Sequence, residues 1–339
     1  MNIFLNDYND LCHENVYQKV SEVHEKGNIG YGFDEYSEKA KRCIKRDLEN
    51  KDVQIEFLAG GTIANIIAIS ANLLPYEGVI AAKSGHIVGH ETGSIEATGH
   101  RVELIETSDG KLSKDLLLNR LKDFTDEYHI VPKLVYISQT TELGTVYSYE
   151  EIKEIYDVCL EYGLYLYIDG ARMAVGLAAS DIEVSDLCDI CDIFTLGGTK
   201  NGAMFGEALV IVEEELKHNL RNFMRQRGSV IAKGFITGAQ FLALFEDGLY
   251  YELGKKANDM SIKLAEELKK INIKFNQEPV SNQIFIEMPI EKIKPLEENN
   301  AFEIQPLSDS EKVLRFVTSY RTNEEEINGL ISDLKALED

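Results

Sequence analysis

The chain has 339 residues, with 35 lysines and arginines against 58 aspartates and glutamates, and a formal net charge of -23. That charge would repel nucleic acid and anionic membranes, so we predict neither as a partner. A chain of this length with 44% hydrophobic residues can form one large core and one smaller core. An anionic ligand would have to be bound by locally placed arginines and helix ends.

The sequence predicts neither a targeting signal nor a disulfide framework. The start, MNIFLNDYND, lacks the basic and apolar regions of a secretory signal, and no apolar run is long enough to cross a bilayer. The five cysteines are expected to be reduced thiols, and Cys188 and Cys191 form a single C-x-x-C without a second pair at zinc spacing. We therefore expect a cytoplasmic protein without a bound metal.

The first half of the chain contains a candidate anion site. Residues 9–25 have helical spacing and are interpreted as part of an N-terminal arm, and a glycine-rich turn at 27–34 leads into a helix over 35–48. A strand over 53–58 is followed by Ala59-Gly60-Gly61-Thr62, which opens the next helix. Because free amides at a helix N-terminus favour anions, Gly61 and Thr62 are predicted to bind a phosphate.

Strands and helices then alternate, which predicts crossover units and a mostly parallel sheet. The expected strands are 78–81, 102–106, 134–138, 164–168 and 190–196, with helices at 113–124 and 149–162 between them. Residues 207–212 follow too closely for a crossover helix and should run antiparallel. Helices at 236–245 and 249–271, short strands at 273–275, 283–287, 302–305 and 313–317, and a last helix at 323–337 indicate a separate α+β domain. The predicted division is an arm at 1–25 packing with the small domain, a large domain at 26–247 and a small domain at 248–339.

Chemically active residues follow two of these strands. Asp169 and Arg172 end one strand, and Thr199 and Lys200 end another, so they should share the crevice at the carboxyl edge of the sheet. A carboxylate can hold a pyridine nitrogen protonated, and a buried lysine can form a Schiff base with an aldehyde, as pyridoxal phosphate requires. Taken singly, Asp169 could equally be a helix cap and Lys200 a solvated loop lysine.

Longer motifs in the same order resemble a known family. They are Gly60 to Asn65, Ser84-Gly85-His86, Gln139 to Val146, Tyr167 to Arg172, Gly197 to Gly202 and Leu314 to Ser319. Together they are similar to the low-specificity L-threonine aldolases, in the β-eliminating lyase group of fold-type I pyridoxal-phosphate-dependent enzymes. The resemblance implies an α/β fold with a large, mostly parallel sheet domain and a small α+β domain. It also implies cleavage of L-threonine or L-allo-threonine to glycine and an aldehyde.

The resemblance assigns roles to the central residues. Lys200 would hold pyridoxal 5'-phosphate, Asp169 would face its ring nitrogen, and His86 would stack on its ring. Arg172 and Arg315 would bind the substrate carboxylate in a bidentate manner. His86, His129 or a water molecule would take the β-hydroxyl proton, with His129 matching a second family histidine only if one gap is allowed.

Further implied site residues lie in other segments. Asn6 stands where the family has a serine that contacts the substrate carboxylate, so it is undecided whether Asn6 makes this contact. Tyr31, Arg225 and Lys233 would reach a neighbouring subunit's active site, which implies a dimer at least and a homotetramer as the family's usual state. Two other functions remain: a β-eliminating lyase or dehydratase with the same cofactor, and a non-catalytic protein that binds pyridoxal phosphate.

Overall fold

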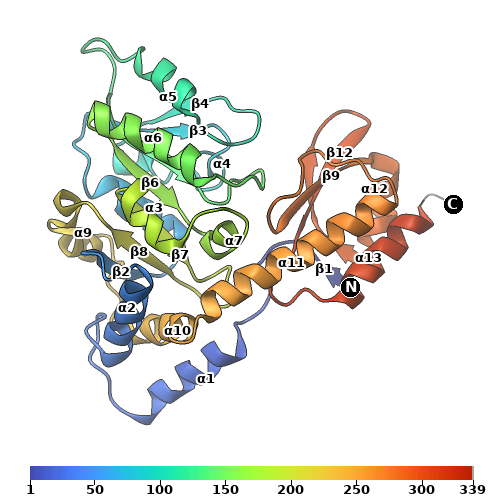
Figure 1. Ribbon diagram of the computed structural model, residues 1–339, viewed down its shortest axis with the longest axis horizontal. Helices are drawn as coiled ribbons and strands as arrows, with labels where there is room; N and C mark the ends of the chain where they lie inside the picture. The colour runs from blue at the N-terminus through green and yellow to red at the C-terminus, as the bar shows by residue number, and fades with distance from the viewer. Residues whose placement is uncertain (338–339) are drawn as a thin grey trace.

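A computed structural model describes residues 1–337, and its centre is a seven-stranded sheet (Figure 1). The strand order is β2-β8-β7-β6-β5-β3-β4. The strands are β2 (Gln54–Leu58), β3 (Glu77–Ala82), β4 (Val102–Ile105), β5 (Val131–Ser138), β6 (Tyr165–Asp169), β7 (Ile193–Gly197) and β8 (Glu207–Ile211). Strands β3 to β7 pair in parallel, whereas β8 runs antiparallel to β7 and β2. The predicted mostly parallel sheet and the antiparallel strand after Lys200 are confirmed.

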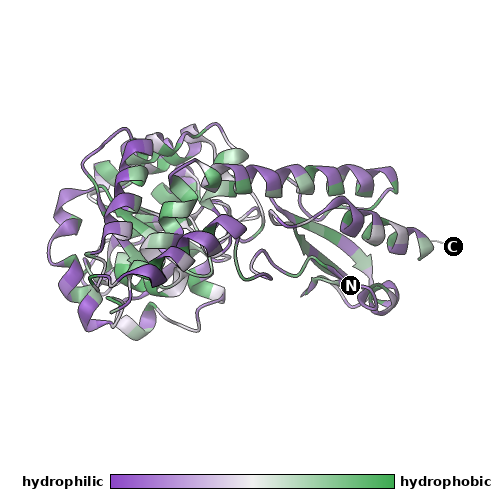
Figure 2. Cartoon of the chain, turned by 90° about the horizontal axis from the view of Figure 1, so that it is seen from below, coloured by the Kyte–Doolittle hydropathy of each residue, from purple (hydrophilic) through white to green (hydrophobic). Residues whose placement is uncertain are grey.

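Helices cover both faces of this sheet, so its strands are buried on both sides. The helices of this part are α2 (Glu35–Asp47), α3 (Gly61–Ser70), α4 (His86–Gly89), α5 (Lys114–Leu121), α6 (Tyr149–Tyr162), α7 (Met173–Ala178), α8 (Leu187–Ile190), α9 (Leu220–Gln226) and α10 (Phe235–Phe245), and α1 (Glu14–Glu22) packs on α10. Successive residues of one strand enter different cores: Val135 packs in one cluster and Tyr136 in the other. Two buried faces explain the nearly continuous apolar runs of these strands, which Figure 2 shows as hydrophobic ribbons inside more hydrophilic helices.

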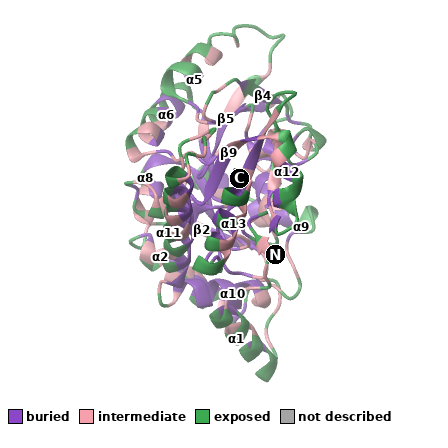
Figure 3. Cartoon of the chain, turned by 90° about the vertical axis from the view of Figure 1, so that its right-hand side faces the viewer, coloured by how far each residue is buried: buried purple, intermediate pink, exposed green. Residues whose placement is uncertain are grey.

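A long helix, α11 (Leu249–Lys270), connects the large sheet with a smaller layer. It packs against α7 and continues to the three-stranded antiparallel sheet β11-β12-β9, whose central region is buried (Figure 3). The elements of this part are β9 (Gln283–Pro289), α12 (Ile290–Glu297), β10 (Asn300–Ala301), β11 (Glu303–Pro306), β12 (Glu311–Val317) and α13 (Glu324–Ala336). The chain start also lies here, because β1 (Asn2–Ile3) pairs with β10.

Three features of the described residues concern the sequence predictions. The strand predicted at residues 273–275 is wrong, because Phe275 forms only an isolated bridge to Ile286. Lys274 and Phe275 instead belong to a connection that runs beside β9. All five cysteines are free thiols. Within residues 1–337, no helix combines the length and apolar character that a membrane crossing needs.

The contact between α11 and α7 predicts a specific packing defect. A Cβ on Gly254 would lie 2.4 Å from the backbone carbonyl carbon and oxygen of Ala174, which a real Cβ does not tolerate. We expect Gly254→Ala to lower the free energy of unfolding by about 1–3 kcal/mol, as overpacking does elsewhere. Urea denaturation measures the loss. Lys255→Ala, at an exposed position of the same helix, is the control and should stay within about 0.5 kcal/mol of wild type.

Candidate active site

A cleft of about 430 Å³ lies at the carboxyl ends of the central strands. It collects side chains from both sheets and from the N-terminal segment. The lining residues are Tyr8, Ala59, Gly60, Gly61, Thr62, His86, His90, Glu142, Asp169, Ala171, Arg172, Thr199, Lys200, Phe205, Glu207, Glu303 and Arg315. Of the site residues predicted from sequence, seven line this cleft: Gly61, Thr62, His86, Asp169, Arg172, Lys200 and Arg315.

Two glycines allow the turns after β6 and β7 to touch. A Cβ on Gly170 would lie 1.9 Å from the carbonyl oxygen of Thr195, and one on Gly197 would lie 2.4 Å from that of Ala171. The Gly197 amide donates to the Gly170 carbonyl at 3.0 Å. This close approach brings the turn carrying Asp169 beside the turn carrying Lys200.

Three donors hold the Asp169 carboxylate in one orientation. Tyr136 Oη donates to Oδ2 at 2.6 Å and Asn65 Nδ2 donates to the same oxygen at 3.2 Å. The Ala171 amide donates to Oδ1 at 3.0 Å. Asn65 is itself fixed by Tyr167 and by a bond to Glu91 Oε1. Asp169 is thus a rigid anion at the floor of the cleft, as a partner for a pyridine nitrogen should be.

Arg172 forms a buried bidentate pair with Asp7. Its Nε donates to Oδ2 at 2.7 Å and its Nη2 to Oδ1 at 3.1 Å, and Asn282 also donates to this carboxylate. Burial alone would raise the pKa of Asp7, but the charges of Arg172 and Lys200 hold it below its usual value. Arg172 Nη1 remains outside the pair and can face a ligand.

Asn6, which we predicted as a substrate contact, is not part of the cleft lining. Its side-chain oxygen accepts from the Tyr8 amide at 3.0 Å and stabilises the local turn. The next two residues take the positions near the site: Asp7 through Arg172, and Tyr8 directly. Asn6 therefore has a local contact in this chain, and its contact with the substrate stays a prediction.

His86 lies between two acids. Its Nδ1 is 3.2 Å from Glu142 Oε1 and its Nε2 is 3.8 Å from Glu91 Oε1, while its ring stacks on His90. Burial acts to lower the pKa of His86, but Glu142 and Asp169 raise it above its usual value. Burial acts to raise the pKa of Glu142, yet His86, Arg172 and Lys200 lower it to about 2. Glu142 is therefore an anion that favours a proton on His86.

Lys200 is placed where its amine loses protons easily. Burial and the adjacent Arg172 lower its pKa, against the opposing charges of Asp7, Glu142 and Asp169. A neutral amine is the nucleophilic form of lysine. The site therefore favours a lysine that can react with an aldehyde.

Arg315 enters the cleft from the smaller sheet. It pairs with Glu303, which stands directly opposite on β11, and its Nη1 donates to Gln283 Oε1 at 3.4 Å. Its buried Nε has no hydrogen-bond partner among the described residues. Arg315 thus has donor capacity left for a carboxylate in the cleft.

The opposite wall of the cleft is the start of α3. Gly60, Gly61 and Thr62 line the cleft, and no side chain caps this helix. The first amides of a helix are unsatisfied, so a phosphate fits this end. With a reactive lysine, a fixed carboxylate and an imidazole opposite, the residues present fit pyridoxal phosphate.

His129 is far from these groups in the fold. It precedes β5, at the amino end of the strand, and its Nδ1 lies 2.8 Å from Asp126 on the exposed surface. The cleft is at the opposite, carboxyl edge of the sheet. The structure therefore contradicts the prediction that His129 serves the site of its own chain, and Glu142 is the side chain found beside His86 instead.

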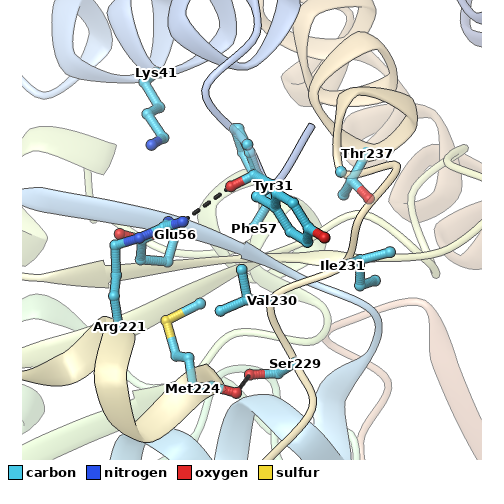
Figure 4. A pocket seen from close by; sticks show the side chains of 12 residues that line it. Tyr31, Lys41, Glu56, Phe57, Arg221, Met224, Ser229, Val230, Ile231 and Thr237 are labelled. Atoms are coloured by element: carbon cyan, nitrogen blue, oxygen red, sulfur yellow. Dashed lines mark hydrogen bonds and ion pairs between the residues drawn. The ribbon is translucent and has the colours of Figure 1, made fainter. Parts of the chain in front are cut away.

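Three other predicted residues gather outside the cleft of this chain. Tyr31 has a left-handed backbone with φ 63°, and its ring lies under the Arg225 guanidinium at 4.8 Å. Figure 4 shows the pocket around it, where Arg221 donates to the Tyr31 carbonyl at 2.9 Å. Lys233 is exposed and lies between two residues of this pocket, Ile231 and Gly234.

Four acids of the site were not predicted as site residues: Asp7, Glu142, Glu207 and Glu303. Glu142 lies within a motif that supported the family resemblance, and Asp7 follows Asn6, so both had a signal in the sequence. Glu207 begins β8 and Glu303 begins β11, where they resembled ordinary strand residues. Only the register of each strand shows that they reach the cleft.

The architecture defines the class of protein. A large, mostly parallel sheet with the cleft at its carboxyl edge and a small antiparallel layer is the architecture of fold-type I pyridoxal-phosphate-dependent enzymes. A serine palmitoyltransferase from Sphingomonas wittichii shares this fold, with a TM-score of 0.76 at 13% identity over 99% of this chain and 86% of its own.

Closer relatives define the family. A family model described as "Beta-eliminating lyase" matches residues 15–291, and the chain belongs to this family. The structure of Leishmania major threonine aldolase is 39% identical, with a TM-score of 0.97 over 99% of each chain. The low specificity L-threonine aldolase of Pseudomonas aeruginosa is 28% identical over 97% of this chain and 95% of its own.

The contact between His86 and Glu142 predicts a change in titration. Glu142→Gln removes a negative charge beside the imidazole, so the pKa of His86 should fall. NMR titration of the histidine ring protons measures the midpoint. The ring signals of His129, which pairs with Asp126 away from the cleft, serve as the internal reference. An unchanged His86 midpoint would show that Glu142 does not favour the protonated ring.

Proposed function

We propose that the protein is a threonine aldolase that uses pyridoxal 5'-phosphate to cleave L-threonine, L-allo-threonine and related β-hydroxy-α-amino acids to glycine and an aldehyde. The observation that carries the proposal is the meeting of Lys200, Asp169 and His86 with Arg172 and Arg315 in one cleft. The reaction itself is suggested by the threonine aldolases that this chain resembles.

The cofactor has a place for each of its parts. When bound, it supplies an aldehyde for Lys200 and a ring that withdraws electrons from the substrate. Asp169 would hold a proton on the ring nitrogen, and His86 would cover one ring face. The uncapped start of α3 would bind the phosphate through backbone amides.

The two arginines would orient the substrate. Arg172 has a guanidinium edge outside its pair with Asp7, and Arg315 has an unpartnered Nε. A carboxylate held between two planar guanidinium groups is fixed in direction as well as position. Orientation decides which bond to Cα is perpendicular to the ring and therefore breaks.

The pair of His86 and Glu142 would handle the proton of the β-hydroxyl. Retro-aldol cleavage of the Cα-Cβ bond turns the β-hydroxyl carbon into an aldehyde, so the hydroxyl proton must leave, and the bound cofactor would accommodate the electron pair of the broken bond. A histidine that titrates near neutral pH can accept that proton and later release it. Glu142 supports this role, because its carboxylate stabilises the imidazolium that forms.

Assembly from several subunits is part of the proposal. Large apolar side chains are exposed in the first 33 residues: Leu5, Tyr8, Leu11, Tyr17, Ile29, Tyr31 and Phe33. With Arg225 and Lys233 nearby, this surface would suit contact with another copy, which would bring Tyr31 and these cations toward its cleft. We propose a homotetramer with shared sites.

The free cysteines are consistent with a reducing compartment, and we propose the cytoplasm.

Product analysis tests the reaction. With L-threonine and cofactor, we expect glycine and acetaldehyde in equal amounts. A β-eliminating lyase or dehydratase would instead give 2-oxobutyrate and ammonia, and a protein that only binds the cofactor would give neither. Borohydride reduction and peptide mapping should place the pyridoxyl group on Lys200. A label on Lys233 or Lys83 would contradict the site.

Arg315 offers a test of substrate binding. A lysine keeps the charge at this position but cannot reproduce the bidentate geometry, so Arg315→Lys should lose roughly 2–4 kcal/mol of transition-state stabilisation. Cofactor absorbance should remain, because Arg315 contacts no proposed cofactor position. Steady-state kinetics of threonine cleavage measure kcat/KM. Lys312→Ala on the same strand, outside the cleft, should behave as wild type, and an unaffected Arg315→Lys would remove Arg315 from the site.

A further inference from the structure

Glu207 is a buried carboxyl group in the cleft that the proposed reaction does not yet use. It begins β8, pairs with Gly197 of β7, and lies opposite Leu58 of β2. Only 4% of the residue is exposed, yet it lines the same cleft as Lys200. Its Oε2 is buried and has no hydrogen-bond partner among the described residues.

A carboxylate with one unsatisfied oxygen is costly in such a place, even though Thr199 and the Gly198 backbone interact with this group. A buried ionised carboxyl without a full set of donors is disfavoured by several kcal/mol, about 1–3 for a missing hydrogen bond and more for a charge. The other acids in and beside the cleft have partners: Asp7 has Arg172, Glu142 has His86, Glu303 has Arg315, and Asp169 accepts three hydrogen bonds. Glu207 has no arginine or histidine partner among the described residues, and the cation that acts on its carboxyl group is the reactive Lys200.

The electrostatics of the two groups are complementary. Burial raises the pKa of Glu207 to about 8, although Thr199 and Lys200 act in the opposite direction. Burial also lowers the pKa of Lys200. Both shifts favour an uncharged carboxylic acid and an uncharged amine over an ion pair.

Charged and titratable groups from every neighbouring element act on this pair. They are Asp169 and Tyr167 from β6, Arg172 before α7, Glu142 after β5, Asp7 of the N-terminal segment, His86 from α4 and Tyr250 from α11. Most of these already have hydrogen-bonding or ionic partners that fix them. Glu207 is the carboxyl of the cleft lining that keeps a buried oxygen without a hydrogen-bond partner among the described residues, and it interacts electrostatically with Lys200.

We propose that Glu207 is a catalytic acid and base for Lys200, and that it exchanges protons with the lysine nitrogen when this nitrogen binds or releases the cofactor aldehyde. The inference rests on the proposed role of Lys200. As the nitrogen forms a double bond to the aldehyde carbon, it loses two protons and the aldehyde oxygen leaves as water. Glu207 would pass both protons on in turn: it gives a proton to the oxygen and regains one from the nitrogen as the carbon-nitrogen bond forms, and it does so again as the water leaves. It therefore ends protonated, and no other reactant is needed.

The capture of cofactor by apoprotein tests this role without turnover. Stopped-flow absorbance follows the reaction of Lys200 with pyridoxal 5'-phosphate in wild type and in Glu207→Gln, which has the same shape but cannot donate the proton. We expect Glu207→Gln to slow capture about 100-fold at pH 7, at the lower end of the range for loss of a general acid.

The pH profile gives the sign of the effect. The acid form of Glu207 is required, and it is lost as pH rises through its pKa of about 8. Wild-type capture should therefore have a descending component near that pH, and Glu207→Gln should lack it. Glu207→Asp, which keeps a carboxyl group, should recover part of the rate and the pH dependence. A buried glutamate of the same sheet outside the cleft, Glu103, provides the matched control Glu103→Gln, which should match wild type.

An analogue without the aldehyde, 4'-deoxypyridoxine 5'-phosphate, separates chemistry from structure. Its affinity should be equal in wild type and Glu207→Gln, because it forms no bond to Lys200. Weaker analogue binding in Glu207→Gln would indicate a structural role and overturn the inference, as would an unchanged capture rate. If wild type itself formed no covalent link to Lys200, the proposed function would fail instead.

Discussion

A buried ion pair between Arg172 and Asp7 connects the parts of the molecule that form the cleft. Arg172 follows β6 of the large sheet, Asp7 belongs to the N-terminal segment, and Asn282, just before β9 of the small sheet, donates to the same carboxylate. Removing one partner of such a pair leaves a buried charge and costs about 3–5 kcal/mol. The relative position of the two sheets, and therefore of Arg172 and Arg315, depends on this pair.

The other constraint is steric and lies in the sheet itself. Gly170 and Gly197 let the turns after β6 and β7 approach closely, so the carboxylate of Asp169 and the amine of Lys200 enter the cleft from adjacent strands. Parallel strands bring their carboxyl ends to one edge, and close contact between two of these ends concentrates the chemistry there. The parallel strand order places both side chains at the same edge of the sheet, and the two glycines allow the turns that carry them to lie close together.

Sequence reasoning predicted the parts of this design that are local. The apolar strands ending in Asp169 and Lys200, the glycine-rich start of α3 and the antiparallel β8 all follow from short patterns, and the structure has them. The identity of the reaction came from the family resemblance. Contacts between distant segments could not be predicted this way, since Asp7 and Arg172 are 165 residues apart. His129 was assigned by residue type, and only the fold shows that it precedes β5, at the edge of the sheet away from the cleft of its own chain.

The acids in and beside the cleft are balanced by their partners, and this balance decides whether an anionic substrate can bind. The chain carries a net charge of -23, and five acids line the cleft or pair with its lining: Asp7, Glu142, Asp169, Glu207 and Glu303. Bound anions are tolerated there only if these acids are neutralised or satisfied by donors. Arginine and histidine partners neutralise three of them, hydrogen bonds satisfy Asp169, and burial favours the neutral acid at Glu207. The guanidinium N–H groups that these pairs leave unused are therefore the strongest local attraction for a substrate carboxylate. They act against the net negative charge of the protein, which repels anions.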